Sequence, residues 1–171
     1  MKTALTAAGR SPEIPKALDA YGWLVGSWEL DVLHYWAIDV SARGLKGEVH
    51  ADWILEGRAL QDVWIMPRRS ERTAKADKKL NMYGTTLRLW DPLIQAWRIT
   101  WRNPAGDHYE EQIGRLNGKD IVQIGVRPDG TPTRWRFTEI TSNSFHWLGE
   151  SLGLDGQTWK LEGEFRARRT V

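Results

Sequence analysis

Hydrophobic and polar residues alternate along most of the chain between residues 23 and 169. Between residues 97 and 102 every second position is apolar, namely Trp97, Ile99 and Trp101. A period of two places these side chains on one face of a β-strand. The preceding alternating stretch ends in Trp90-Asp91-Pro92-Leu93, where Asp and Pro favour a type I turn. Residues 83–103 are therefore predicted to form an antiparallel hairpin with one apolar face.

The same alternation predicts about ten strands, at residues 28–36, 48–55, 59–66, 83–90, 97–103, 108–116, 119–126, 133–140, 145–150 and 159–169. Short turn signals join them, of which Asn117-Gly118 is the strongest. Crossover helices are not predicted, so the expected fold is all-β, an antiparallel up-and-down barrel. Closing the sheet removes its edges and leaves room for a small ligand. A two-layer sandwich remains the alternative, because alternation alone does not separate the two.

The N-terminal region shows a different pattern. Residues 1–10 are expected to be a flexible tail. Ser11 and Pro12 can begin a helix, so residues 11–22 are predicted to form a short N-terminal helix that covers one end of the barrel. Residues 23–171 would then be the single barrel domain.

The amino-acid composition indicates that the barrel contains a cavity. The 171 residues include 11 Trp, against 3 Phe and 4 Tyr. Large, rigid indole rings suit the lining of a cavity better than a solid core. There is no Cys, which excludes disulfides and thiolate metal sites.

Charge and hydropathy narrow the expected partners. The net charge is +2, with acidic residues interleaved among the basic ones, which argues against nucleic-acid binding. No segment approaches the roughly 18 apolar residues of a membrane span, and the first residues lack the apolar core of a signal peptide. We therefore expect a cytoplasmic protein with no membrane partner. A homodimer through an outer sheet face stays open.

The segment Trp23-Leu-Val-Gly-Ser-Trp28 resembles the opening of calycins, the group of lipocalins, fatty-acid-binding proteins and nitrobindins. In that group a Gly-x-Trp, here Gly26 and Trp28, closes one barrel end. The stretches WILEGRALQDVWIMP, YGTTLRLWDP, AWRITW and RWRFTEIT resemble an uncharacterised family of bacterial lipocalin-like domains. The resemblance implies the fold and no activity. Nitrobindins bind haem through a late His, which has no match after His146, so haem is a minor alternative and no cofactor is expected.

Polar residues on apolar strand faces are the candidates for chemistry, because an enclosed polar group needs a partner or a role. His34 shares a face with Val32 and Trp36. In strand 59–66, either Asp62 or Gln61 faces the interior, and the pattern does not decide between them. Glu111 is a candidate internal carboxylate, with a surface ion pair as the alternative. The four histidines are far apart in sequence, so no metal site is expected.

These observations lead to the hypothesis of a barrel that binds a small hydrophobic molecule, aromatic or polycyclic. The expected ligand-binding residues are Trp28, Trp36, Trp53, Gln61, Trp64, Tyr83, Trp97, Trp101, Trp135, Phe137 and Trp147, with about half of the tryptophans structural. The alternative is a cofactor-free cyclase, isomerase or lyase in which Asp62, His34 or Glu111 acts as general acid or base. A third possibility is a partner-binding module that uses the basic loop at residues 68–79.

Overall fold

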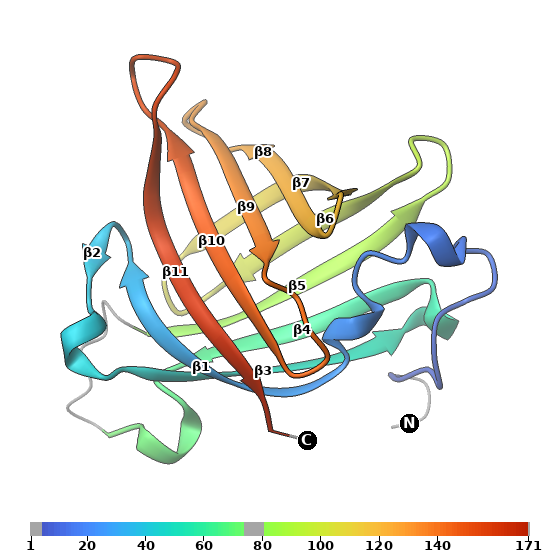
Figure 1. Cartoon of the computed structure of the whole chain (residues 1–171), viewed down its shortest axis with the longest axis horizontal. Coiled ribbons are helices and arrows are strands. Elements are labelled where there is room, and N and C mark those ends of the chain that lie inside the picture. The colour runs from blue at the N-terminus through green and yellow to red at the C-terminus, as the bar shows by residue number, and fades with distance from the viewer. Residues whose placement is uncertain (1–4, 74–80, 171) are drawn as a thin grey trace.

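The computed structural model describes residues 5–73 and 81–170, which form one antiparallel sheet with short connections (Figure 1). Its strands are β1 (Gly26–Tyr35), β2 (Ile38–Asp39), β3 (Lys46–Ile54), β4 (Ala59–Met66), β5 (Met82–Asp91), β6 (Ala96–Asn103), β7 (His108–Asn117), β8 (Asp120–Val126), β9 (Pro132–Thr138), β10 (Ser144–Leu152) and β11 (Trp159–Arg169). Single 3-10 turns lie at η2 (Lys16–Leu18), η3 (Gly22–Leu24), η4 (Ser41–Arg43), η5 (Leu55–Gly57) and η6 (Arg69–Glu71).

Ten of these strands close into a barrel. From β3 to β11 each strand pairs with the next along the chain, and β1 pairs with both β3 and β11. The closing seam runs from Trp28 opposite Arg169 to Tyr35 opposite Gly163. The two-residue strand β2 only extends a hairpin from the end of β1. The predicted antiparallel barrel is confirmed. The two-sheet alternative is excluded, because the pairing of β1 with β11 closes one continuous sheet on itself.

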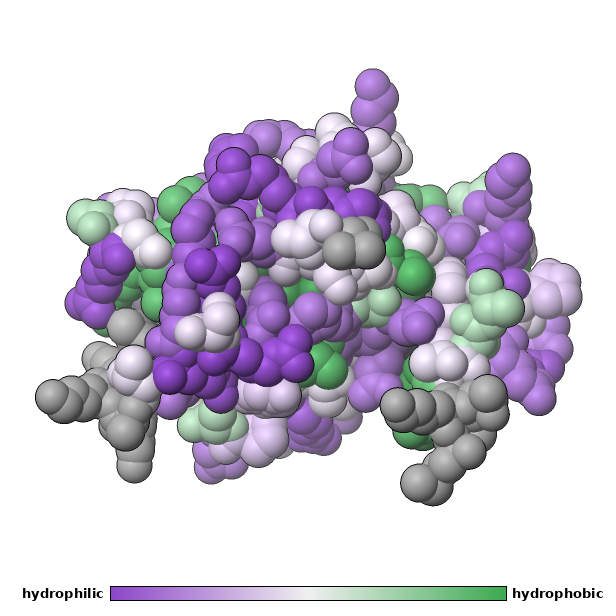
Figure 2. All heavy atoms as spheres, turned by 90° about the horizontal axis from the view of Figure 1, so that it is seen from below, coloured by the Kyte–Doolittle hydropathy of each residue, from purple (hydrophilic) through white to green (hydrophobic). Residues whose placement is uncertain are grey.

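Alternation sorts the side chains between the inside and the outside of the barrel. In β6, Trp97, Ile99 and Trp101 are buried, while the residues between them face outward. The face of the molecule seen in Figure 2 is largely hydrophilic, with hydrophobic residues in small separate patches. Most of the apolar surface therefore lies inside, where the aromatic rings gather.

Two irregularities change which side chains point inward. The β1–β11 register shifts between Val32 and His34, and the β10–β11 register shifts between Gly149 and Glu150. A bulge inserts one residue, so the alternation changes phase beyond it. Tyr35 is consequently buried, and His34 turns to the outer face.

The predicted N-terminal helix is wrong, because residues 11–22 form only the 3-10 turns η2 and η3 among irregular backbone. Pro15 explains the difference. A proline inside a helix disfavours helical geometry in the residue before it, here Ile14, and lacks the N–H that a helix interior needs. Asp19 then accepts the Gly22 backbone N–H at 2.8 Å and stabilises a turn in place of a helix.

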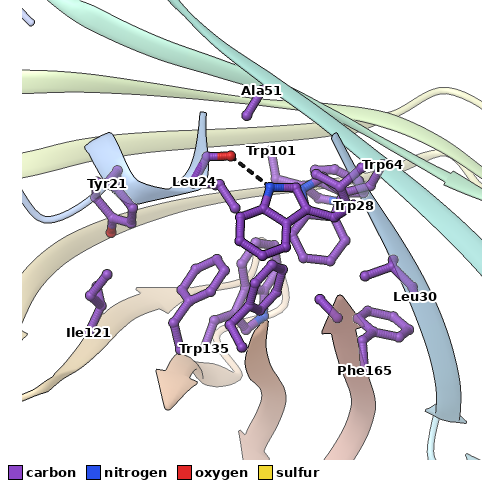
Figure 3. Packing of buried hydrophobic residues seen from close by; sticks show 14 of the residues in the cluster. Tyr21, Leu24, Trp28, Leu30, Ala51, Trp64, Trp101, Ile121, Trp135 and Phe165 are labelled. Atoms are coloured by element: carbon purple, nitrogen blue, oxygen red, sulfur yellow. Dashed lines mark hydrogen bonds between the residues drawn. The ribbon is translucent and has the colours of Figure 1, made fainter. Parts of the chain in front are cut away.

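This segment nevertheless closes one end of the barrel, opposite β2 in the view of Figure 1. Its backbone carbonyls accept indole N–H groups from the barrel: Leu18 from Trp97 at 3.0 Å, and Leu24 from Trp28 at 2.8 Å (Figure 3). The Arg169 guanidinium lies 4.0 Å from the Trp28 ring centroid and seals the same end. Residues 5–10 of the expected tail include Ala7, bonded to the Trp53 carbonyl at 2.7 Å, and residues 1–4 lie outside the described residues.

Candidate functional site

A cavity opens at the barrel end opposite the N-terminal segment. Five tryptophans line it, together with Phe165, Met82 and a group of polar side chains. The tryptophans come from β4, β6, β9, β10 and the turn after β1, namely Trp64, Trp101, Trp135, Trp147 and Trp36. Trp147 stacks on Phe165 with centroids 5.0 Å apart, and meets Trp135 edge-on at 5.4 Å. The walls therefore present aromatic faces and edges from several strands.

The cavity is small, with a volume of about 80 Å³. Since a single water needs roughly 10–15 Å³ by this measure, the cavity holds only a handful of waters. This size suits a molecule with one or two rings that reaches in from the mouth.

Trp36 lies at the mouth on a strained turn. Trp36 and Ala37 join β1 to β2 and have φ values of 49° and 61°. A two-residue hairpin turn with two positive φ angles ordinarily contains Asn or Gly, and a bulky residue there costs on the order of 1–2 kcal/mol. The indole is 43% exposed, and its centroid lies 4.9 Å from the His108 ring. This turn therefore destabilises the fold slightly, and it holds a large ring beside the opening.

A charged network forms the polar wall next to Trp36. The carboxylate of Glu110 on β7 is 1% exposed and accepts a hydrogen bond from Arg127 Nε at 2.9 Å. Arg127 also donates to Glu162 at 3.0 Å, and its guanidinium lies 5.6 Å from the Trp36 ring centroid. The network ties β7 and β11 to Arg127, the residue that directly follows β8, at the mouth.

All four acceptor positions of Glu110 are used. Besides Arg127, it accepts from His108 Nε2 at 3.1 Å, Thr133 Oγ1 at 2.7 Å and Gln112 Nε2 at 3.0 Å. Burial alone would raise the pKa of Glu110, but hydrogen bonds from His108 and Thr133 and the charge of Arg127 lower it below its usual value. Glu110 is therefore a fixed anion that orders its neighbours.

The tautomer of His108 follows from its partners. The indole N–H of Trp101 can only donate, and it points at His108 Nδ1 at 3.3 Å. Nδ1 is then the acceptor, and Nε2 carries the proton that is donated to Glu110. The chain Trp101–His108–Glu110 fixes both rings against the cavity.

The cavity wall formed by β4 and β5 contains a buried ion pair. Asp62 is fully buried and Arg88 is 2% exposed, and Arg88 Nη1 donates to Asp62 Oδ2. Asp62 also accepts the backbone N–H of Thr86 at 3.0 Å. Arg88 and Thr86 line the cavity, so this pair forms part of its polar surface.

The question left open in strand 59–66 is thereby settled. Leu60, Asp62 and Trp64 face the interior. Gln61 faces the outside, where its amide donates to Thr85 at 3.0 Å, so it does not line this cavity. Asp62 is enclosed as one of the two alternatives stated, but it has a guanidinium partner that the sequence pattern did not identify.

Two other candidates lie outside the cavity. His34 bonds to Glu164 at 3.1 Å on the outer face, because the bulge after Val32 reverses its direction. Glu111 is exposed, since β7 directs Glu110 and Gln112 inward. The expected inward placement of His34 is therefore corrected, and Glu111 lies on the surface, which is the second of the two alternatives stated for it.

The expected ligand-binding aromatics divide between the two ends of the barrel. Trp36, Trp64, Trp101, Trp135 and Trp147 line the cavity. Trp28, Trp53, Trp97 and Phe137 are buried in the core and do not line the cavity. Tyr83 is 43% exposed, and the Arg72 guanidinium lies 5.0 Å from its ring centroid.

Sequence reasoning missed the polar half of the site: Arg88, His108, Glu110, Arg127 and Glu162. Most of these are charged residues in alternating strands, where a charge normally marks the outer face. One usable signal in the sequence was Gly114, because a glycine inside a strand often marks the close approach of another group. The structure shows that approach, since a Cβ at Gly114 would lie 2.3 Å from the Tyr21 hydroxyl. Glu110 and Gln112 share the inward phase of Gly114.

A second group of polar side chains lies on the outer face of β1 and β3. His50 bonds to Ser27 at 2.9 Å through Nδ1 and to Glu48 at 3.1 Å through Nε2. Arg69 donates to Glu48 at 2.7 Å, and its Nη2 lies 3.0 Å from the same His50 Nε2. Arg69 and His50 therefore share the Glu48 carboxylate, and the group is organised as a surface ion network.

Neither a cluster of metal-ligating side chains nor a membrane-spanning helix is found in the described part of the chain. Within residues 5–73 and 81–170, no group of three or more His, Asp or Glu side chains is arranged to hold a metal ion. His108 is the only histidine among the residues that line the cavity, and both of its nitrogens are engaged. In the described part of the chain, no helix has the length and hydropathy needed to cross a membrane. The basic loop expected at residues 68–79 falls partly outside the described residues, from residue 74 onward.

Comparison with known proteins finds only partial similarity. No family model matches the chain. A probable cytosol aminopeptidase of Burkholderia ambifaria is 35% identical over 72 residues, which cover 42% of this chain and 14% of that protein. A probable cytosol aminopeptidase of Hamiltonella defensa is 31% identical over 70 residues, 41% of this chain and 13% of that protein. The chain thus spans about one seventh of the length of these relatives, which shows no family; the closed ten-strand barrel is consistent with a calycin-like fold.

Proposed function

We propose that the protein binds a small hydrophobic molecule, aromatic in character, in the open end of the barrel. The supporting observation is the cavity lined by five tryptophans beside the charged network of Glu110, Arg127 and Glu162. Binding sites for small molecules are typically concave and mostly apolar, with a few placed polar groups. One end of the barrel is closed by the N-terminal segment, so the ligand would enter past Trp36.

Size and chemistry refine this proposal. The small volume of the cavity favours one or two rings over a large polycyclic molecule. The edge-on and stacked contacts among Trp135, Trp147 and Phe165 show that aromatic rings pack well at these positions. A flat ligand would continue this packing.

The proposal is tested by filling the cavity. Thr86 lines it, whereas Thr85 on the same strand faces the outside and bonds to the Asp62 carbonyl at 2.6 Å. We expect the wild-type protein to enhance the fluorescence of the two-ring dye 6-propionyl-2-(dimethylamino)naphthalene. Thr86→Phe should abolish this binding and Thr85→Phe should retain it, with folding of both verified by near-UV circular dichroism. Unchanged binding in folded Thr86→Phe would contradict the proposal.

Catalysis is the second candidate, and the His108–Glu110 pair at the cavity is the observation that favours it. A cofactor-free cyclase, isomerase or lyase needs an acid or base that is free to exchange a proton. Every carboxylate of the site is instead held by a guanidinium. We therefore expect dye affinity to be constant between about pH 5 and 8. A titration in that range that His108→Asn removes would favour catalysis instead.

A further inference from the structure

The Arg88 guanidinium is anchored in the barrel at one point. Its Nη1 donates to Asp62, which the backbone N–H of Thr86 also holds at 3.0 Å. The guanidinium lies against aromatic rings, with its Cζ 4.8 Å from the centroid of Tyr21 and 5.8 Å from that of Phe137. Burial raises the pKa of Tyr21 well above its usual range, and the Arg88 charge opposes the shift. Arg88 is thus a cation enclosed by aromatic groups and one carboxylate.

Arg88 has hydrogen-bond donors that the protein leaves unused. A guanidinium carries five N–H groups. Among the described residues, Asp62 is the one carboxylate bonded to Arg88, the Tyr21 hydroxyl also interacts with the guanidinium, and Nε is buried with no partner. The aromatic rings attract the positive charge but are no substitute for an oxygen acceptor. A buried donor without an acceptor is unfavourable, so an acceptor brought by a ligand would be strongly preferred there.

The charges around the cavity indicate which kind of acceptor fits. Two guanidiniums, Arg88 and Arg127, are matched by three carboxylates, Asp62, Glu110 and Glu162. Asp62 neutralises Arg88 directly, and the mouth carries more negative than positive charge. An anionic ligand would be repelled at the mouth and would compete with Asp62 inside. A neutral oxygen would bond to the unused donors without that cost.

We propose that the ligand is a neutral aromatic molecule with a carbonyl-type oxygen, which accepts a hydrogen bond from Arg88 while its ring packs among the tryptophans. This inference rests on the proposed function and specifies its ligand class. It makes Arg88 the residue that selects an oxygen-bearing aromatic molecule over a hydrocarbon of the same shape.

The test uses three probes of one size: 2-acetylnaphthalene, 2-ethylnaphthalene and 2-naphthoate. Affinities are measured by equilibrium dialysis with the full chain. We expect the ketone to bind about tenfold more tightly than the hydrocarbon, as one hydrogen bond to a charged donor provides. The naphthoate should bind more weakly than the ketone. The infrared carbonyl stretch of bound 2-acetylnaphthalene should lie at lower frequency than that of the same molecule in an apolar solvent. This measurement uses the wild-type protein alone.

The matched variant replaces both members of the ion pair, Asp62→Leu with Arg88→Met, so that no buried charge is left without a partner. In this variant the ketone and the hydrocarbon should bind equally. Equal affinities in the wild type, an unshifted carbonyl stretch, or a preference that survives in the folded variant would overturn the inference while leaving the proposed function standing. If 2-naphthoate binds more tightly than the other two probes, the proposal that the ligand is neutral is overturned. If none of the three probes binds, the proposed function fails as well.

Discussion

Glu110 and Glu111 are adjacent in sequence and have opposite environments. Glu111 is exposed on the outer face of β7. Glu110 is enclosed and accepts hydrogen bonds from an arginine, a histidine, a threonine and a glutamine. The difference arises only from the alternation of the strand, which makes the pair an internal control for the geometry of the site.

Replacing Glu110 by Gln should lower the free energy of unfolding by about 2 kcal/mol at pH 7, because a buried, charge-assisted network loses its anion. The pKa of Glu110 is lower in the folded state than its ordinary value of 4.5. Its stabilisation is therefore present above that pH and is lost as pH falls below it. Urea unfolding across this range should show the wild type approaching Glu110→Gln in acid.

The neighbouring variant Glu111→Gln supplies the control. It should follow the wild type at every pH, since an exposed carboxylate on the outer face contributes little. The reverse outcome, in which Glu111→Gln is destabilised and Glu110→Gln matches the wild type, would show that β7 has the opposite phase.

Single residues were the least predictable part of the site. The alternation predicts that His34 faces inward. A bulge that no turn residue in the sequence indicates places His34 on the outer face instead. Glu111 appeared to share a face with Ile113, but the inner positions of β7 are Glu110 and Gln112. Asp62 remained undecided because both faces of its strand are mixed. These outcomes depend on cross-strand register, which is a property of pairing and not of one strand.

Among the elements, the N-terminal segment contributes to the core without forming a helix. Ile14 is 1% exposed, whereas Ile38 in β2 is 53% exposed. The carbonyls of η2 and η3 accept indole protons from the barrel floor. The segment is therefore part of the folded barrel and closes it.

Ile14→Ala should destabilise the protein by about 2–4 kcal/mol, the usual cost of truncating a buried isoleucine. Ile38→Ala, the same change on an exposed strand, should cost less than about 0.5 kcal/mol. Both values come from chemical denaturation. Equal effects of the two substitutions would mean that the N-terminal segment does not pack on the barrel.

The strands themselves were predictable, and the connection to the N-terminal segment was not. The bounds expected for residues 59–66 coincide with β4, because the turns on either side contain Gly and Pro. The helix expected at residues 11–22 failed because Pro15 outweighs a favourable cap and helical spacing. Local turn chemistry specifies strands well, whereas a short amphipathic segment takes its shape from the surface it covers.

For the whole molecule, the two barrel ends differ in kind. One end is filled by indole rings whose N–H groups bond to the backbone of the N-terminal segment. The other end is lined by indole rings around an open cavity, beside a charged network and a strained turn that carries Trp36. The surplus of tryptophan predicted a cavity from composition, and closure of the barrel determined which of the rings line it.

The central claim is that aromatic ligands bind at the cavity end and not at the closed end. The most direct measurement is the set of indole N–H signals of the 11 tryptophans in a ¹H–¹⁵N NMR spectrum, followed as 6-propionyl-2-(dimethylamino)naphthalene is added. The account predicts shifts for Trp36, Trp64, Trp101, Trp135 and Trp147. The signals of Trp28, Trp53 and Trp97 should stay in place. A spectrum without shifts, or with shifts confined to Trp28 and Trp97, would contradict it.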